Sequence, residues 1–294
     1  MSQFPGPKGP TTRPSGAKSS TNKFRTKKRL GQNFLEDRLI LQAILEAADL
    51  EPEDRVLEIG PGQGVLTREL VRRAGQVVAV ELDRDLVPVL EPLAREFPQL
   101  QLVWGDFLKV SWEDLGLPET GTKVVANIPY YITTPILLKL LHEQELSSKP
   151  FAELTGRVSD ILIMVQAEVA NRLNARPGTK DYGSITVLVQ YAATVETVVK
   201  VPRTAFKPAP KVDSKVIRIR PRQVPLVDVQ DPRVFFRVVR AAFNQRRKTL
   251  LNALSMSFEK DRLHEAEAAT GISMTRRGET LSIAEFATLA NTLS

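Results

Sequence analysis

The sequence predicts an α/β protein, in which a doubly wound parallel sheet is followed by a small all-helical C-terminal domain. Two observations lead to this fold. Between residues 56 and 165, short apolar runs of strand length alternate with segments of helical periodicity, the pattern of parallel strands joined by helices. Residues 231–294, in contrast, show helical periodicity alone.

The individual elements follow from these patterns. Apolar residues at helical spacing predict helices at 33–50, 65–73, 85–97 and 135–145. Apolar runs predict strands at 56–59, 77–80, 100–104, 124–126 and 161–165. Two further β-rich stretches, 194–201 and 212–219, are expected to extend the same sheet.

Composition divides the chain into three parts. Residues 1–29 contain eight basic side chains, no acidic ones and four prolines, so we expect a disordered basic extension. Residues 30–222 hold the predicted sheet and its helices. A proline-bearing linker then leads into a helical domain at 223–294.

Several chemistries are excluded by what the chain lacks. It has no cysteine, which excludes disulfides, thiolate metal sites and cysteine nucleophiles. His142 and His264 are isolated and give no basis for a conventional zinc or Ser-His-Asp centre, so we expect no metal. No apolar run reaches the ~18 residues of a membrane span, and no apolar core follows the basic N-terminus. We therefore expect a cytoplasmic protein without a membrane span.

The formal net charge of +7 is distributed unevenly. Residues 30–120 carry 8 basic and 18 acidic side chains, whereas residues 200–294 carry 18 basic and 9 acidic ones. This polarity predicts a positive face for a polyanion and a separate acidic half, whose ligand is neutral or cationic.

A glycine-rich loop, Gly60-Pro-Gly62-Gln-Gly64, connects the first predicted strand to a helix. Glycines at such a turn let the backbone approach a ligand, and the helix N-terminus offers unpaired N–H groups. A dinucleotide-binding fingerprint would need Gly or Ala at Val65, and the Gly-Lys-Ser/Thr of a P-loop is missing. A tight structural turn remains an alternative for this loop.

Acidic residues follow the next two strands. Glu81 ends the second strand, where a carboxylate can accept both hydroxyls of a ribose, and Asp106 follows the third strand, where it can accept from an adenine amino group. Each could alone be a helix N-cap or a solvated charge. Together the strand ends predict a carboxylate-lined pocket for an adenosine-containing ligand that lacks phosphates, and S-adenosylmethionine is such a ligand.

The fourth strand ends in Asn127-Ile-Pro129-Tyr130. An adenine amine is a poor nucleophile because its lone pair is delocalised into the ring. An Asn side-chain oxygen and a neighbouring carbonyl that accept its hydrogen bonds localise that lone pair. The proline fixes the turn and the tyrosine can stack on the base. Taken by itself, the segment could also be a turn with a core tyrosine.

Several segments together resemble the ribosomal RNA adenine N6,N6-dimethyltransferases of the KsgA type, over residues 30 to about 290. They are GQNFL at 31–35, VLEIGPGQGVL at 56–66, VELD at 80–83, Gly105-Asp106, NIPY at 127–130, FKPAPKVDS at 206–214 and AFNQRRKTL at 242–250. The resemblance implies a Rossmann-like class I S-adenosylmethionine-dependent methyltransferase domain at 30–222 and a helical RNA-binding domain at 223–294. It also implies N6,N6-dimethylation of two adjacent adenosines in the 3′-terminal hairpin loop of small-subunit (16S) rRNA during subunit assembly.

Specific residues take roles by this resemblance. It implies that cofactor contacts come from Asn33, Leu35, Gly60, Glu81, Asp106 and Asn127. It implies a catalytic pocket for the flipped adenine formed by Asn127, Pro129, Tyr130 and Phe206, with the two aromatic rings on either side of the base. Tyr131 and Thr133 depart from the family pattern, in which we expect Asn and Ser, at the rim of this pocket.

The basic half is expected to bind RNA phosphates. Lys207 and Lys211 flank Phe206, and Arg246, Arg247 and Lys248 are three consecutive cations predicted to open a helix. Positive charges at a helix N-terminus are unfavourable because they oppose the helix dipole. We therefore expect these three side chains to be present for RNA contact. The alternative is that they form a solvated face.

Two rival functions remain open. A 23S rRNA adenine N6-methyltransferase of the antibiotic-resistance type would share the pocket but differ in the RNA-facing segments, and those at 206–214 and 242–250 favour the small-subunit enzyme. A non-catalytic RNA-binding assembly factor would not need Glu81, Asp106 or Asn127. We expect a monomer that acts on small-subunit rRNA within a pre-ribosomal 30S particle.

Overall fold

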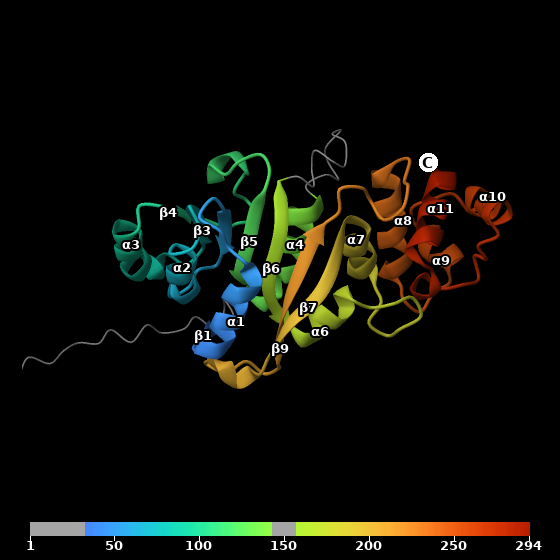
Figure 1. The fold of residues 1–294 in the computed structure, drawn as a ribbon. Helices are drawn as coiled ribbons and strands as arrows, with labels where there is room; N and C mark the ends of the chain where they lie inside the picture. Colours follow the sequence, from blue (N-terminus) through green and yellow to red (C-terminus); the bar gives the residue numbers. More distant parts are fainter. Residues whose placement is uncertain (1–32, 143–156) are drawn as a thin grey trace, which may run out of the picture.

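The computed structural model describes residues 33–142 and 157–294, so the predicted basic extension at 1–29 lies outside the described residues. A central sheet is covered by helices on both faces, and the C-terminal helices pack at one end of the molecule (Figure 1). The helices in the described ranges are too short or too polar to cross a membrane.

The central sheet has seven strands in the order β4-β3-β2-β5-β6-β9-β7. The strands are β2 (Arg55–Ile59), β3 (Gln76–Glu81), β4 (Leu100–Trp104), β5 (Thr122–Asn127), β6 (Val158–Gln166), β7 (Ala193–Val201) and β9 (Ser214–Pro221). The first five run parallel, whereas β9 is antiparallel to both β6 and β7. The predicted doubly wound α/β fold is therefore confirmed, and the two predicted additional strands do extend the sheet.

Alternate residues of the strands form two hydrophobic cores, one on each face of the sheet. The core on one face includes side chains of α1 (Arg38–Ala48), α2 (Val65–Leu70) and α3 (Val87–Glu96). The core on the opposite face includes α4 (Thr133–His142), α6 (Ala167–Leu173) and α7 (Ser184–Ala192). Both faces of the parallel strands are thus buried, which explains their nearly continuous apolar runs.

The predicted helix at 33–50 is wrong at its start. Phe34 and Leu35 form a short strand, β1 (Phe34–Leu35), which pairs antiparallel with β8 (Phe206–Lys207). The helix α1 begins only at Arg38, because the Asp37 carboxylate accepts hydrogen bonds from the N–H groups of Leu39 and Ile40 and caps it. Pattern alone misses this strand because its partner lies some 170 residues further along the chain.

The C-terminal part consists of α8 (Pro232–Asn244), α9 (Leu250–Leu254), α10 (Lys260–Thr270) and α11 (Ile283–Leu293). The core of these helices is continuous with the core beneath α7. Phe235 of α8 is fully buried, and its ring centroid lies 4.9 Å from that of Tyr191 on α7. Phe236 meets the same tyrosine edge to face at 5.9 Å. The linker at 222–229 therefore connects two parts that share one apolar interface.

This shared interface leads to a prediction about stability. Phe235→Ala should lower the free energy of unfolding by about 3–5 kcal/mol, because it leaves a cavity between α7 and α8. Urea unfolding monitored by circular dichroism should show a single transition, with its midpoint at a lower urea concentration than in the wild type. Asn244→Ala, at an exposed position of the same helix, is the control and should change little. Two separate transitions, with only the smaller one shifted, would contradict a shared core.

Candidate active site

A pocket opens at the carboxyl edge of the sheet, where β4, β3, β2 and β5 end side by side. Parallel strands in this order bring segments that are distant in sequence to one place. The pocket is lined by all six predicted cofactor contacts, namely Asn33, Leu35, Gly60, Glu81, Asp106 and Asn127. Pro129 and Tyr130 of the predicted catalytic group line it as well.

The glycine loop lines the pocket and lies against Phe34 of β1. Gly60 and Gly62 both have positive φ, at 74° and 57°, a backbone conformation that side chains disfavour. A Cβ atom on Gly62 would also lie 3.0 Å from the ring of Phe34. Glycine is thus required here by backbone conformation and by the close approach of β1.

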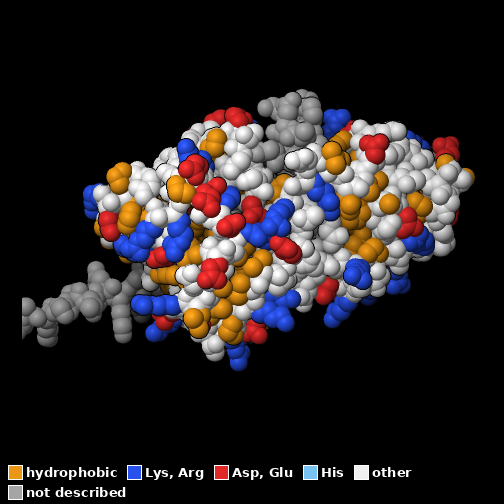
Figure 2. Space-filling view, in the orientation of Figure 1, with side chains coloured by type: hydrophobic (Ala, Val, Ile, Leu, Met, Phe, Trp, Pro, Cys, Tyr) orange, Lys and Arg blue, Asp and Glu red, His pale blue; other side chains and the backbone are white. Residues whose placement is uncertain are grey.

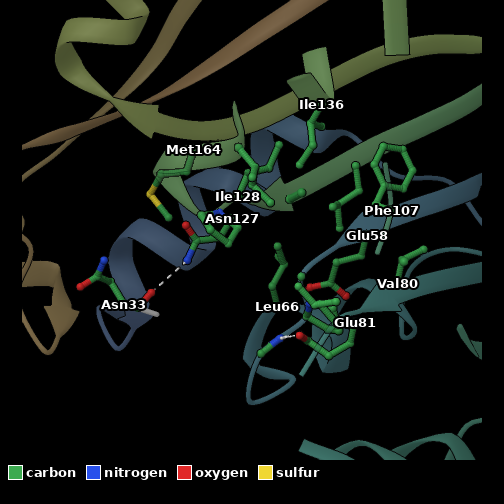
Figure 3. Close-up of a pocket in the computed structure, with 18 of the residues that line it drawn as sticks. Asn33, Glu58, Leu66, Val80, Glu81, Phe107, Asn127, Ile128, Ile136 and Met164 are labelled. Atoms are coloured by element: carbon green, nitrogen blue, oxygen red, sulfur yellow. Dashed lines mark hydrogen bonds between the residues drawn. The ribbon is translucent and has the colours of Figure 1, made fainter. Parts of the chain in front are cut away.

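Glu81 is held by backbone groups from two directions. Its Oε2 accepts a hydrogen bond from the Gly62 N–H at 3.1 Å, and its Oε1 accepts one from the Asp83 N–H at 2.8 Å. Burial raises the pKa of this carboxyl group, while these two hydrogen bonds favour its charged form. Its orientation is fixed before any ligand arrives (Figure 3).

Asp106 organises the loop that follows β4. Its Oδ1 accepts from the Leu108 N–H at 3.0 Å, and its carbonyl oxygen accepts from the N–H groups of Lys109 and Val110. The Oδ2 atom makes no hydrogen bond with the residues described. One carboxylate oxygen thus builds the loop while the other is available to a pocket ligand.

Asn127 connects the pocket to β1. Its Nδ2 donates to the carbonyl oxygen of Asn33 at 3.4 Å (Figure 3). With the amide in this orientation, its Oδ1 is the atom left to accept a hydrogen bond from a ligand in the pocket. The buried Ile128 anchors the turn, and the Ile132 N–H donates to the Pro129 carbonyl at 3.1 Å. The side chain that would face a target amine is therefore fixed on both sides.

The hydroxyl of Tyr130 lies 2.6 Å from the Oγ of Ser214, the first residue of β9. Ser214 is almost fully buried, whereas Tyr130 is only half-buried and lines the pocket. Ser214 ends the FKPAPKVDS motif, and no role was predicted for it from the sequence. Its position shows that the C-terminal end of that motif supports the aromatic ring beside the pocket.

Phe206 is placed differently from Tyr130. It pairs with Leu35 across β1 and β8, is 5% exposed, and does not line the pocket. Phe206 belongs to the same apolar core as Leu35. Its expected place across the flipped base from Tyr130 stays a prediction.

Glu58 lines the pocket, although no role was predicted for it from the sequence. It lies on β2, is 1% exposed, and its Oε2 has no hydrogen-bond partner in the described part of the chain. Burial raises its pKa to about 8, and the negative charge of Glu81 adds to this effect. The sequence does contain a signal for this residue, a glutamate inside the apolar run VLEI. Burying a carboxyl group there costs free energy, which suggests a functional reason for it.

The predicted RNA-binding cations fall into two groups. Lys207, Lys211, Arg247 and Lys248 are exposed, and the Lys207 Nζ lies 3.7 Å from the Glu36 Oε2. Arg246 is exposed as well, but it donates to the carbonyl oxygen of Lys180 at 2.7 Å and contacts the Glu279 carboxylate at 3.4 Å. Arg246 thus connects the end of α8 to neighbouring loops, and these contacts explain its presence without RNA.

The cluster 246–248 was expected to open a helix, and this is wrong. These residues form the turn between α8 and α9, which begins at Leu250 after Thr249 as its N-cap. The helix dipole therefore gives no reason to expect RNA contact from them. Basic side chains nevertheless recur along the lower edge of the molecule, from the region of β1 and β9 to the C-terminal helices (Figure 2).

The raised pKa of Glu58 predicts a pH-dependent stability. Between its ordinary pKa of 4.5 and its folded value of about 8, the folded chain binds more protons than the unfolded chain, so stability falls as pH rises. Glu58→Gln replaces the carboxyl group by a neutral amide and so removes the free-energy cost of burying a charge at high pH. We expect its gain in unfolding free energy over the wild type to grow by about 2–4 kcal/mol from pH 5 to pH 8 in urea titrations. The exposed Glu119→Gln serves as control, and a gain independent of pH would refute the assignment.

Known proteins share similarity with most of this chain. A family model described as ribosomal RNA adenine dimethylase matches residues 23–294. A protein of Moorella thermoacetica named ribosomal RNA small subunit methyltransferase A is 50% identical over 276 residues, which cover 91% of this chain and 92% of that protein. A protein of the same name from Clostridium acetobutylicum is 46% identical over 269 residues, covering 91% and 94%.

Two solved structures share the fold. A dimethyladenosine transferase from Plasmodium falciparum superposes with a TM-score of 0.69 at 25% identity, covering 87% of this chain and 95% of that one. The 23S rRNA methyltransferase ErmE gives a TM-score of 0.62 at 30% identity, covering 89% and 99%. These matches span both the pocket and the C-terminal helices, and they confirm the resemblance inferred from the motifs. The chain belongs to the ribosomal RNA adenine dimethylase family.

Proposed function

We propose that this protein transfers methyl groups from S-adenosylmethionine to the N6 of two adjacent adenosines in the 3′-terminal hairpin loop of 16S rRNA. The product is N6,N6-dimethyladenosine, formed in the cytoplasm by a monomer acting on a pre-ribosomal 30S particle. The observation that carries the proposal is the Oδ1 of Asn127, available at the end of a pocket with buried carboxyl groups and bordered by Tyr130.

The residues present fit S-adenosylmethionine. Glu81 is oriented to accept the ribose hydroxyls, and Asp106 keeps one oxygen for the adenine amino group. Lys and Arg are absent from the described lining residues, so a phosphate would find no neutralising partner there. The charged form of the Glu81 carboxyl group, which two backbone hydrogen bonds favour, suits a cationic ligand instead. When bound, S-adenosylmethionine supplies a methyl group on a positively charged sulfur, a good leaving group.

The chain's own residues act on the target adenine. The Oδ1 of Asn127 and a neighbouring backbone carbonyl accept hydrogen bonds from the N6 amine and localise its lone pair toward the methyl group. Tyr130, held by Ser214, offers its ring to an adenine flipped out of the RNA loop. Catalysis then rests on alignment of the nucleophile, and the amine proton leaves to water without a general base.

The exposed cations Lys207, Lys211, Arg247 and Lys248 support the RNA part of the proposal. Contacts from such side chains to phosphates provide affinity and orientation, while the extruded base provides selectivity. A 23S rRNA substrate is the alternative, because ErmE shares the fold at 30% identity. The names and the 46–50% identity of the two relatives from M. thermoacetica and C. acetobutylicum favour the small subunit.

The assignment is tested with labelled S-adenosylmethionine and immature small subunits, followed by mapping of the modified bases. We expect dimethyladenosine at two adjacent positions of the 3′-terminal loop with the wild type. Asn127→Ala should reduce transfer by about 10²-fold or more, because it removes the acceptor at the reacting amine, and should leave RNA affinity nearly unchanged. Asn252→Ala, at an exposed position of α9, is the control. The absence of dimethyladenosine from that loop with the wild type would sink the assignment.

The contact between Tyr130 and Ser214 is tested by a double-mutant cycle. Tyr130→Phe and Ser214→Ala each remove the same hydrogen bond, worth about 1 kcal/mol, so each should lower kcat/KM for RNA roughly 3- to 10-fold. Because both changes break one interaction, the double variant should be little worse than either single variant. Strictly additive losses would show that the two side chains act independently.

A further inference from the structure

Lys139 reaches from α4 to the loop that follows β4. Its Nζ donates a hydrogen bond to the Phe107 carbonyl at 2.8 Å and a second one to the Val110 carbonyl. The same ammonium lies 4.9 Å from the centroid of the Phe107 ring, which is cation–π distance. Three contacts thus join one half-buried cation to a single short loop.

These contacts close the loop that carries Asp106. Within the loop, the Asp106 carbonyl accepts from the N–H groups of Lys109 and Val110, and its Oδ1 accepts from the Leu108 N–H. The ammonium binds carbonyl groups from either side of this turn, and hydrogen bonds to a charged donor are stronger than neutral ones. The direction of the Asp106 carboxylate therefore depends on Lys139 as well as on the loop's own hydrogen bonds.

The position of Lys139 along α4 connects this loop to the other half of the site. Ile136, one helical turn earlier on the same face, lines the pocket near Phe107 (Figure 3). The helix α4 begins at Thr133, directly after the turn that presents Asn127 and Tyr130. One rigid helix thus spans the distance from the target-base turn to the loop of Asp106.

We propose that Lys139 is a positioning residue for cofactor binding, acting by fixing the 105–110 loop so that Asp106 and Phe107 face the pocket. The proposal rests on the proposed function, which places the adenine of S-adenosylmethionine beside Asp106. Lys139 does not touch the ligand in this arrangement. Its loss should therefore change the affinity for the cofactor and not the rate of transfer once the pocket is filled.

The test compares Lys139→Met with Lys109→Met. Lys109 lies in the same loop and is exposed, so each substitution removes one positive charge, but only Lys139→Met removes the hydrogen bonds to the Phe107 and Val110 carbonyls. We expect Lys139→Met to raise the calorimetric Kd and the KM for S-adenosylmethionine roughly tenfold, the effect of losing charge-assisted hydrogen bonds. The kcat at saturating S-adenosylmethionine and the KM for RNA should stay within about twofold of wild type, as should every constant of Lys109→Met.

A double variant separates positioning from general destabilisation. In an Asp106→Ala background, Lys139→Met should weaken cofactor binding little further, because the residue acts through that carboxylate. If Lys139→Met does not fold, Lys139→Gln, which keeps a neutral N–H donor group and removes the charge, takes its place in the same measurements. Cofactor affinity equal to that of Lys109→Met, or additive losses in the double variant, would overturn the proposal while leaving the proposed function intact. A wild type that binds no S-adenosylmethionine would overturn both.

Discussion

The parallel pairing of β4, β3, β2 and β5 determines where the glycine loop, Glu81, Asp106 and Asn127 of the pocket lie. It brings four chain reversals to one edge of the sheet, so that a glycine loop, two carboxylates and an asparagine meet without any of them being close in sequence. Burial on both faces by two hydrophobic cores makes this arrangement rigid. The site is therefore a product of strand order.

The two halves of the chain carry opposite charge. The acidic half places Glu58 and Glu81 in a buried pocket, where burial raises the pKa of both groups. The raised pKa means that these carboxyl groups lose their protons less readily, and a cation bound beside them would favour their charged forms. The basic half leaves exposed cations on the 202–213 connection and in the turn between α8 and α9, where phosphates can reach them. The modest net charge of +7 conceals this separation.

The short pairing of β1 with β8 joins these halves. It holds Leu35 and Phe206 together and brings the Asn33 carbonyl to the side chain of Asn127. This contact also explains two features that the sequence pattern does not show, the burial of Phe206 and the late start of α1. Phe206 is buried beside β1 and does not line the pocket, and the first residues of the expected helix at 33–50 are a strand. Arg246 likewise binds a carbonyl group and Glu279, contacts that no local pattern reveals.

The α/β class, the sheet strands, the family and the pocket contacts could all be predicted from the sequence, because each has a local signature: apolar runs, glycines at a turn, and acidic or amide residues at strand ends. The antiparallel direction of β9, the β1–β8 pair, and the supporting roles of Ser214 and Lys139 emerged only from the folded chain. The fold also showed that Arg246, although half exposed, donates to a backbone carbonyl and contacts Glu279. The physical reason is that these features are contacts between residues up to about 170 positions apart, and side-chain spacing carries no information about such partners.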